Sequence, residues 1–305
     1  MDATQQPLVS IIAISYNHAA YIKEALESVF EQTYSTIELI IADDASTDNS
    51  LQCIEEVTKG KVVTIISNTV SKGNCRTFNE ALRVAQGKYI IDFALDDRMY
   101  PDRVRKQVDC LEKLNTKTGV VFTNVDVINE SGVFLYNHYP RFNHPLTNDV
   151  PQGNIFTFVL SRYYINPVSM MFRREVIEHL NGYDESLSYE DFDFWIRSSR
   201  IYDYVYLPEI LSSKRIVPHS LSAGFSKRNK EHMFESTLKV CKKAWWLCQN
   251  ENEIQSLVQR CRYELKQSVK YGYSTISNEY LTILKETDKY FFMYHHLVKI
   301  LMMIY

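Results

Sequence analysis

The sequence predicts an α/β protein: a mostly parallel, Rossmann-like sheet flanked by helices, followed by a helical C-terminal region. Short apolar runs alternate with amphipathic helical patterns up to about residue 125, and short connections between such elements favour right-handed parallel crossovers. Helical periodicity without strand patterns takes over from Ser226. We therefore expect an α/β domain over residues 1–225 and a helical region over residues 226–305.

The N-terminal part alternates between strand and helix. Its compact apolar runs are typical of buried parallel strands. The expected strands are Val9–Ser15, Ile37–Ala42, Val62–Ile66 and the run that begins at Tyr89. Apolar residues at helical spacing follow each of them. The expected helices are Tyr21–Gln32, Asn49–Val57, Arg76–Ala85 and Asp102–Leu114. Gly87 is expected to end the third helix, since glycine readily adopts the left-handed conformation of a helix C-terminus.

The pattern is less regular after Leu114. Val120–Val125 is expected to form a further strand, Asn129–Gly132 a hairpin turn, and Asn137–Asp149 a polar loop. The remaining extended pieces are expected at Pro167–Arg173, Tyr204–Leu207 and Ile210–Ile216.

Composition narrows the class of partner. A hydrophobic content of 45% with 23% charged residues is that of a globular protein, not of a disordered one. The net charge of −3 hides an asymmetry, because residues 226–305 hold 13 lysines and arginines against 8 acidic residues. The acidic front part argues against nucleic acid as a ligand and favours a cation site. The basic rear part suggests an anionic neighbour such as a membrane surface.

Cysteine usage and the N-terminus predict the compartment. The six cysteines form no C-x-x-C pair, so free thiols in a reducing environment are expected. The segment MDATQQPLVS lacks the basic and apolar parts of a signal peptide. No run reaches the roughly 20 apolar residues that span a bilayer. We expect a cytoplasmic protein, with peripheral attachment to the cytoplasmic membrane face as an option.

Acidic residues follow several expected strands: Asp43 with Asp44, Asp96 with Asp97, and more weakly Asp126. Ligands of open parallel sheets collect beyond the carboxyl ends of the strands. Adjacent carboxylates repel each other and are best stabilised by a cation between them. Mg²⁺ and Mn²⁺ take oxygen ligands, often one or two carboxylates plus substrate phosphates. Helix capping is the default explanation for a single such acid, and it suffices for Asp48.

No glycine-rich phosphate loop is present, neither G-x-G-x-x-G nor G-x-x-x-x-G-K. A bound diphosphate would therefore be neutralised by the metal and by scattered cations such as Lys72 or Arg76.

A second acidic pair, Glu190-Asp191, begins a helix whose apolar face carries Phe192, Trp195 and Ile196. Carboxylates in a first helical turn are favoured by the helix dipole, which is a purely structural explanation. The functional alternative is a general base that acts on an acceptor hydroxyl group. The spacing leaves both open.

In order along the chain, these motifs resemble family 2 glycosyltransferases, the inverting enzymes of GT-A fold, over about residues 7–225. The first strand with Ser15-Tyr16-Asn17 resembles the family's opening, and the run 43–48, D-D-A-S-T-D, is similar to its D-D-G-S-T-D turn. Residues 79–90 resemble the helix and strand before the metal motif, and Glu190-Asp191 resembles the late E-D pair.

The resemblance implies a role for each motif. Asp43 or Asp44 would contact the uracil or ribose of a nucleotide sugar, with Tyr16, Lys72 and Asp97 also at the donor. Asp96 would bind Mn²⁺ or Mg²⁺, and Asp191 would be the base. The implied donor is a nucleotide-diphosphate sugar, most simply a UDP-sugar carrying a hexosyl or N-acetylhexosaminyl group. The implied acceptor is a glycan or a lipid-linked glycan in cell-surface polysaccharide synthesis.

Two departures from the family's pattern affect the choice of candidate site residues. Ala94 stands where many relatives have the first Asp of D-x-D-D, and Asp92 is the nearby candidate to replace it. Lys214-Arg215 occupies the place of the family's Y-R-x-H segment. Arg215 and His219 are therefore further candidate site residues, although a surface histidine is the simpler reading of His219.

Residues 289–305 form an apolar and aromatic pattern with a polar stripe at His295, His296 and Lys299. A helix lying in a membrane interface fits this pattern, and so does a helix packed on the domain or on a second copy of the chain.

Two other functions stay open: a catalytically silent nucleotide- or glycan-binding module of the same fold, and a nucleotidyltransferase. The latter normally has a glycine-rich basic loop, which Ser15–Tyr21 lacks.

Overall fold

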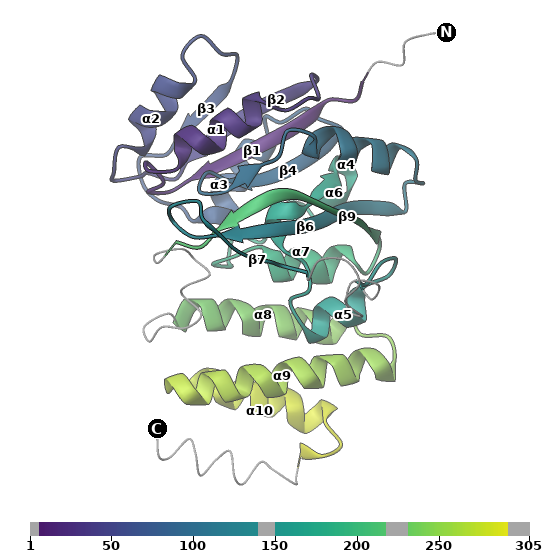
Figure 1. Ribbon diagram of the computed structural model, residues 1–305. Helices are drawn as coiled ribbons and strands as arrows, with labels where there is room; N and C mark the ends of the chain where they lie inside the picture. The colour runs from purple at the N-terminus through teal and green to yellow at the C-terminus, as the bar shows by residue number, and fades with distance from the viewer. Residues whose placement is uncertain (1–5, 140–149, 218–230, 292–305) are drawn as a thin grey trace. The chain divides into compact units, whose positions relative to one another are not determined.

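The structure is a computed structural model and describes residues 6–139, 150–217 and 231–291 (Figure 1). The chain forms two compact units. The first, which we call the sheet unit, comprises residues 1–153, 165–185 and 201–217. The second, the helical unit, comprises residues 154–164, 186–200 and 218–305. The expected boundary near residue 225 lies outside the described residues and stays a prediction.

The sheet unit is built on a nine-stranded sheet in the order β3-β2-β1-β4-β8-β6-β9-β5, with β7 paired to β6. Its strands are β1 (Val9–Ser15), β2 (Ile37–Asp43), β3 (Thr64–Ser67), β4 (Tyr89–Ala94), β5 (Arg98–Met99), β6 (Thr118–Ile128), β7 (Phe134–Asn137), β8 (Met171–Arg173) and β9 (Asp203–Arg215). Strands β3, β2, β1 and β4 run parallel. Since β8 is antiparallel to both β4 and β6, strands β6 and β9 run in the direction of β1. The prediction of a mostly parallel α/β sheet is confirmed.

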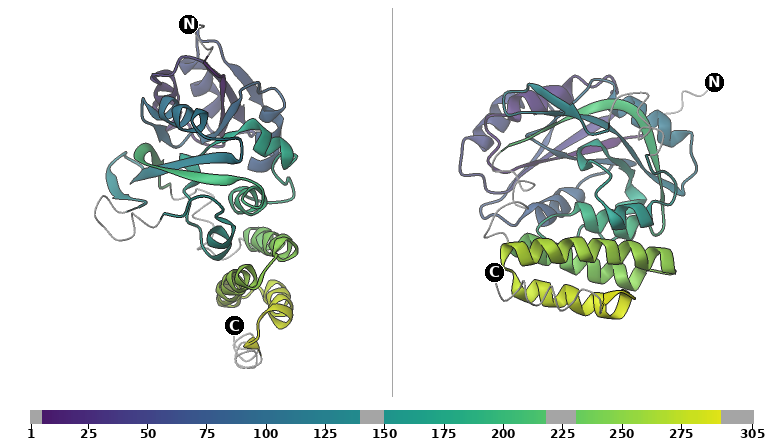
Figure 2. Two further views of the ribbon diagram at one scale, coloured as in Figure 1. Left: turned by 90° about the vertical axis from the view of Figure 1, so that its right-hand side faces the viewer. Right: turned by 60° about the horizontal axis from the view of Figure 1, so that its bottom comes forward.

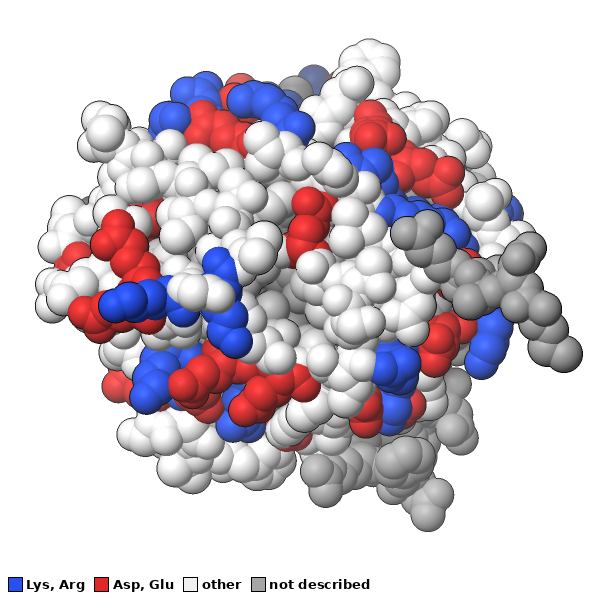
Figure 3. All heavy atoms as spheres, turned by 90° about the horizontal axis from the view of Figure 1, so that it is seen from above, with Lys and Arg blue, Asp and Glu red and all other residues white. Residues whose placement is uncertain are grey.

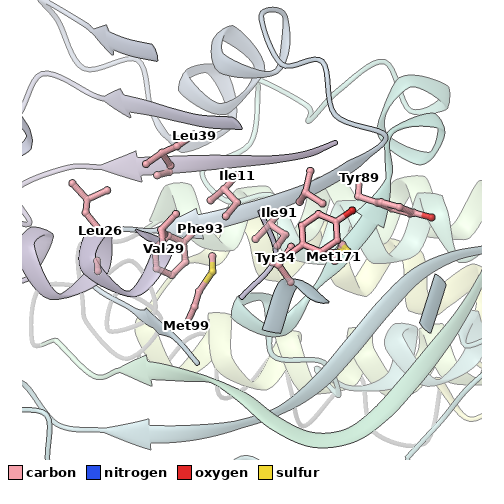
Figure 4. Close-up of a cluster of buried hydrophobic side chains, with 14 of the residues drawn as sticks. Ile11, Leu26, Val29, Tyr34, Leu39, Tyr89, Ile91, Phe93, Met99 and Met171 are labelled. Carbon is pink, nitrogen blue, oxygen red and sulfur yellow. The ribbon is translucent and has the colours of Figure 1, made fainter. Parts of the chain in front are cut away.

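The core lies between one face of this sheet and helices of the first half of the chain. The helices of the sheet unit are α1 (Ile22–Phe30), α2 (Ser50–Val57), α3 (Asn74–Leu82), α4 (Arg103–Glu112) and α6 (Arg174–His179), with a 3-10 turn at Pro167–Ser169. Figure 4 shows Ile11, Ile91 and Phe93 of the sheet beside Leu26 and Val29 of α1. All five are buried, as expected for the apolar stripe of an amphipathic helix on a sheet.

The late strands differ in detail from the expected ones. Tyr204–Leu207 and Ile210–Ile216 were expected as separate pieces but belong to one strand, β9. Its register against β6 jumps from Leu207 to Ile210, and Pro208 at the jump has no N–H to donate to a neighbouring strand. The expected strand Pro167–Arg173 is a 3-10 turn followed by the three residues of β8. The expected hairpin turn at Asn129–Gly132 is confirmed, joining β6 to β7.

Gly87 does not end a helix, which corrects the expectation. Helix α3 already ends at Leu82. A Cβ atom at Gly87 would lie 2.4 Å from the backbone nitrogen of Ser10. Glycine is required there because the backbone approaches β1 closely, and not because of a left-handed conformation.

The helical unit contains α5 (Phe156–Ser161), α7 (Asp191–Ser198), α8 (Glu231–Leu247), α9 (Glu251–Tyr271) and α10 (Ser274–Thr287). Helices α8, α9 and α10 pack side by side (Figure 2). Buried Arg260 of α9 stacks on the rings of Tyr163 and Phe192 at 4.2 and 4.9 Å and pairs with Glu264 at 3.1 Å. Within the described residues, no helix is both long and apolar enough to cross a membrane.

Charged side chains of both signs are interspersed on the face of the molecule seen in Figure 3. That face carries no extended patch of one sign among the described residues, so individual charged groups matter more there than a broad field. These groups are found at the carboxyl ends of the strands.

Candidate functional site

The carboxyl ends of β1, β2 and β4 meet at one edge of the sheet. Ser15 pairs with Asp43, and Ile14 pairs with Ala94. The residues that follow these strands therefore come together, and we call this edge, which carries Tyr16, Asp43, Asp44, Asp96 and Asp97, the acid edge. The expected convergence of the first two acidic pairs agrees with this register.

Two loops of the acid edge are tied to each other by hydrogen bonds. Asn17, in the left-handed conformation at φ 57°, accepts from Thr47 N at 2.8 Å and donates its own N–H to Ser46 Oγ at 2.9 Å. His18 N donates to Ser50 Oγ at 2.9 Å. These bonds fix the backbone after β1 against the turn after β2. Tyr16 is about half exposed in this loop.

The turn after β2 contains a residue that departs from the family's motif. Ala45 has φ 60°, a left-handed conformation that glycine adopts without cost and alanine at roughly 1 kcal/mol. Asp43 holds the turn, because its carboxylate accepts from Ser46 N at 2.9 Å and Ser46 Oγ at 2.5 Å.

Asp48 was expected to cap α2, but Asn49 is the N-cap residue. The Asp48 carboxylate instead accepts from Ser50 N at 2.9 Å and from Ala19 N at 3.1 Å, which adds to the link between the two loops.

Asp44 is buried and fully engaged by the protein. Its carboxylate accepts hydrogen bonds of 2.7–2.9 Å from four donors between β3 and α3: Ser71 Oγ, Lys72 N, Gly73 N and Thr77 Oγ1. Burial raises the pKa of the Asp44 carboxyl group, but these hydrogen bonds outweigh it, so that the pKa lies below its ordinary value. Asp44 therefore acts first as a clamp on the segment 68–77.

Lys72, expected at the donor, is placed by this clamp. Its Nζ donates to Glu80 at 2.7 Å and to Asn68 Oδ1 at 3.0 Å, and its side chain is partly exposed. Arg76, the other scattered cation, pairs with Glu185 at 2.9 Å. Both cations already have acidic partners.

Asp96 differs from these acids. Its side chain is only 12% exposed, yet its carboxylate accepts no hydrogen bond from the described residues. The imidazole of His18 lies close by, with its Nε2 3.9 Å from Asp96 Oδ2. The neighbouring Asp97 is buried, and burial together with the charge of Asp96 holds its pKa well above the ordinary value. Two adjacent acids that are nearly buried, one of them without a hydrogen-bond donor, form a site that a cation would stabilise.

Arg215 locks this pair of acids in place. Its backbone N–H donates to Asp97 Oδ1 at 2.7 Å, and its Nε donates to the carbonyl oxygen of Asp96 at 2.9 Å. Nη1 donates to the carbonyl oxygen of Glu130 at 2.9 Å, and Nη2 donates to Glu24. The guanidinium group is buried and also stacks on Tyr21 at 4.9 Å. Arg215 therefore acts by positioning Asp96 and Asp97.

Two other acids of the sheet have partners of their own. Asp92, the candidate to replace the missing first Asp, accepts from Tyr183 OH at 3.0 Å; its role at a metal stays a prediction. Asp126 does not end a strand, because β6 continues to Ile128. It accepts from Tyr100 OH at 2.6 Å and Asn137 Nδ2 at 2.5 Å, which makes it part of a polar network inside the sheet.

Glu190 and Asp191 lie where the sequence predicts, at the start of α7 in the helical unit. Glu190 is the N-cap residue, and its carbonyl oxygen accepts from Phe194 N at 2.8 Å. Asp191 is half-buried in the first turn. Asp193, two residues later, is buried and pairs with Arg197 and Lys243, both at 2.6 Å. His219 lies outside the described residues.

The donor set at Asp96 fits a hard divalent cation. Within the described residues, no three acidic, histidine or cysteine side chains gather around one point as a closed metal cage would require. Mg²⁺ and Mn²⁺ sites in enzymes need fewer protein ligands, because substrate phosphates and water complete the shell. The open carboxylate of Asp96 suits such a site. When bound, the metal would neutralise charge on a diphosphate.

His18 and Glu24 were missed by sequence reasoning. The available signal for His18 was its place directly after Tyr16-Asn17, at the end of a buried strand. Glu24 lies on the exposed side of an ordinary amphipathic helix. It pairs with Arg215, which is far away in the sequence, and no local sequence pattern indicates such a pairing.

Comparisons with known proteins point in one direction. The model of the family described as glycosyl transferase family 2 matches residues 10–180. A protein of Rickettsia bellii described as an uncharacterized glycosyltransferase is 30% identical over 75% of this chain. The alignment covers 33% of that relative, so the chain spans about one third of its length.

Two solved structures share the fold at 16% sequence identity. One is TarS 1-349 of S. aureus in complex with UDP-GlcNAc, with a TM-score of 0.66, covering 92% of this chain and 80% of that one. The other is the mannosyltransferase PcManGT of Pyrobaculum calidifontis in complex with GDP-Man and Mn²⁺, with a TM-score of 0.64, covering 94% of this chain and 77% of that one. The sheet and its helices have the GT-A fold.

Proposed function

Because the chain belongs to glycosyl transferase family 2, we propose that it is an inverting glycosyltransferase. It moves a sugar from a nucleotide-diphosphate donor to a hydroxyl group of a glycan or lipid-linked acceptor, in the synthesis of a cell-surface polysaccharide. The observation that carries the proposal is the open carboxylate of Asp96 at the acid edge, beside buried Asp97. The carboxylates of the other acids of that edge accept hydrogen bonds from groups of the protein itself.

On the donor side, Asp96 would hold Mn²⁺ or Mg²⁺. Asp97 and Arg215 would keep Asp96 in position. The nucleotide lies along the loops that begin at Tyr16 and Asp43. A UDP-sugar is the first donor to test, and a GDP-sugar the second, since the structural neighbours were solved with UDP-GlcNAc and with GDP-Man. Asp44 and Lys72 contribute by shaping the segment 68–77.

On the acceptor side, Asp191 is the base. The acceptor oxygen forms the new bond to the anomeric carbon while its proton passes to the Asp191 carboxylate. The bond between the anomeric carbon and the diphosphate oxygen breaks, and the nucleoside diphosphate leaves with its electron pair. A single displacement of this kind inverts the anomeric configuration. Glu190, one residue earlier, is the rival for this role.

Calorimetric titration tests the donor half of the proposal. UDP-GlcNAc and GDP-mannose are titrated into the full chain with and without Mn²⁺, and into Asp96→Asn. We expect Mn²⁺-dependent binding of one nucleotide sugar in the wild type and its loss in Asp96→Asn. The control is Asp109→Asn, an exposed acid on α4, which should bind as the wild type does. Equal affinity of the wild type and Asp96→Asn would overturn the assignment of Asp96.

A second candidate function is the silent binding module, which the alanine at position 94 favours. It predicts nucleotide-sugar binding without release of nucleoside diphosphate against any panel of acceptors.

A further inference from the structure

We propose that His18 is a second protein ligand of the divalent cation held by Asp96, through its Nε2 atom. This inference rests on the proposed function, since it deepens the metal site of the donor half. The sequence places His18 after the first strand, and its assignment as a ligand comes from the distance between its ring and Asp96.

The two side chains face each other without touching. His18 Nε2 and Asp96 Oδ2 are 3.9 Å apart, which is too long for a hydrogen bond. Ligand atoms bound to one small cation at about 2.1 Å lie roughly 3.0 Å apart when adjacent and about 4.2 Å apart when opposite. The observed separation falls inside that range. An imidazole nitrogen and a carboxylate oxygen at this distance can both reach one ion between them.

Hydrogen bonds hold the backbone that carries each of the two side chains. His18 N is tied to Ser50 Oγ at 2.9 Å, and the preceding Asn17 is tied to the turn after β2. Asp96 is held by Arg215 through its carbonyl oxygen at 2.9 Å. The loops that carry the two side chains follow β1 and β4, which are neighbours in the sheet.

The His18 imidazole also lies near the carboxylate of Asp48, but the side chains of His18 and Asp96 make no hydrogen bond to the described residues. His18 Nδ1 is buried and has no hydrogen-bond partner within the described residues, and the Asp96 carboxylate accepts no hydrogen bond there. Side-chain exposures of 21% for His18 and 12% for Asp96 leave a path for an ion to enter. In contrast, Asp43 and Asp44 are saturated by donors of the protein.

An imidazole ligand has a consequence for the choice of metal. Oxygen ligands alone suit Mg²⁺ and Mn²⁺, whereas an imidazole nitrogen favours the transition metals. The site should therefore bind Mn²⁺ in preference to Mg²⁺, and His18 should be the source of that preference.

The test is direct binding of Mn²⁺ to the full chain, followed by the electron paramagnetic resonance signal of the free ion, with Mg²⁺ as competitor. His18→Ala should weaken Mn²⁺ binding at least about tenfold, the lower end of what loss of even an outer-shell partner costs. His18→Asp should restore binding through a carboxylate but reduce the preference for Mn²⁺ over Mg²⁺. His179→Ala changes an exposed histidine at the end of α6 and should leave binding unchanged.

The outcomes separate this inference from the proposed function. Loss of Mn²⁺ binding in Asp96→Asn with wild-type affinity in His18→Ala would overturn the inference and leave Asp96 as the metal residue. Tighter Mn²⁺ binding by His18→Ala would also overturn it, because His18 would then act as a competing cation. Absence of Mn²⁺ binding by the wild type, with or without UDP, would remove the metal site of the proposed function itself.

Discussion

The acids at the acid edge differ in how many hydrogen bonds their carboxylates accept. Asp44 accepts four at 2.9 Å or less, and Asp43 accepts two from one serine. Asp96 accepts none within the described residues. A carboxylate that is nearly buried without donors is unfavourable unless a cation compensates it. The hydrogen-bond pattern thus distinguishes the acids that hold the protein's own loops from Asp96, which we propose as the metal ligand.

At the same scale, the base of the reaction is decided between two adjacent residues. A helix turns about 100° per residue, so Glu190 and Asp191 cannot both face one acceptor oxygen. Asp191→Asn keeps the shape of the side chain and removes the proton acceptor. We expect turnover at saturating donor to fall by about 10²- to 10⁴-fold, with donor affinity from calorimetry unchanged.

Glu190→Gln is the matched control, and its turnover should stay within a few fold of the wild type. Turnover of Asp191→Asn near that of the wild type would rule Asp191 out as the base. A large loss in Glu190→Gln alone would transfer the role to Glu190.

At the scale of elements, Asp44 at the end of β2 organises the whole connection from β3 to α3. We expect Asp44→Asn to lower the free energy of unfolding by about 1.5–3 kcal/mol, the range for hydrogen bonds to a charged group. The amide can replace only part of these bonds, because its nitrogen would face N–H donors. Chemical denaturation at pH 7 measures the difference between variant and wild type.

The pH dependence of that difference follows from the lowered pKa of Asp44. A carboxyl group whose pKa is lower in the folded than in the unfolded protein stabilises the fold above the unfolded value, here 3.8. That contribution is lost as the pH falls through the folded value. The difference between wild type and Asp44→Asn should therefore be constant above about pH 5 and shrink below pH 3.8. A difference that stays constant down to pH 3 would contradict this account.

Strands and helices with a clear hydrophobic pattern could be predicted from the sequence, whereas elements too short to show such a pattern could not. Strand β1 has the predicted bounds, Val9–Ser15, because every one of its residues is buried and the apolar run has sharp ends. Strand β5 has two residues and β8 three, which is too short for any period to show. Helix α5 has six residues, and its apolar run F-T-F-V-L can be read as strand or helix.

The candidate site divides in the same way. Asp96, Asp97 and the Glu190-Asp191 pair stand out in the sequence because charge interrupts an apolar pattern. The role of Arg215 as a clamp could not be derived, because its partners Glu24, Asp96 and Glu130 lie 85–191 residues away. The same holds for the facing of His18 and Asp96.

At the scale of the whole molecule, the helical unit draws on two distant parts of the chain. Helices α5 and α7 lie between strands in the sequence but pack with α8 and α9. Arg260 of α9 stacks on Tyr163 and Phe192, and Glu253 pairs with Arg200 at 2.8 Å. The sequence predicted a helical region only from residue 226, since the alternation of elements says nothing about such long-range packing.

This organisation predicts the result of cutting the chain at residue 225. The fragment 1–225 would keep α5 and α7 but lose α8 and α9. The buried side chain of Phe192 would then lose Arg260, which stacks on its ring, and α7 would lose its packing against α8. A side chain of this kind contributes about 1.5–3 kcal/mol when fully buried, so we expect the segment around Asp191 to lose its fixed structure. Hydrogen exchange should find α7 unprotected in the fragment and protected in the full chain, while the strands β1, β2 and β4 stay protected in both. Equal protection of α7 in the two proteins would instead support residues 1–225 as an independent domain, with the helices that follow as a separate appendage.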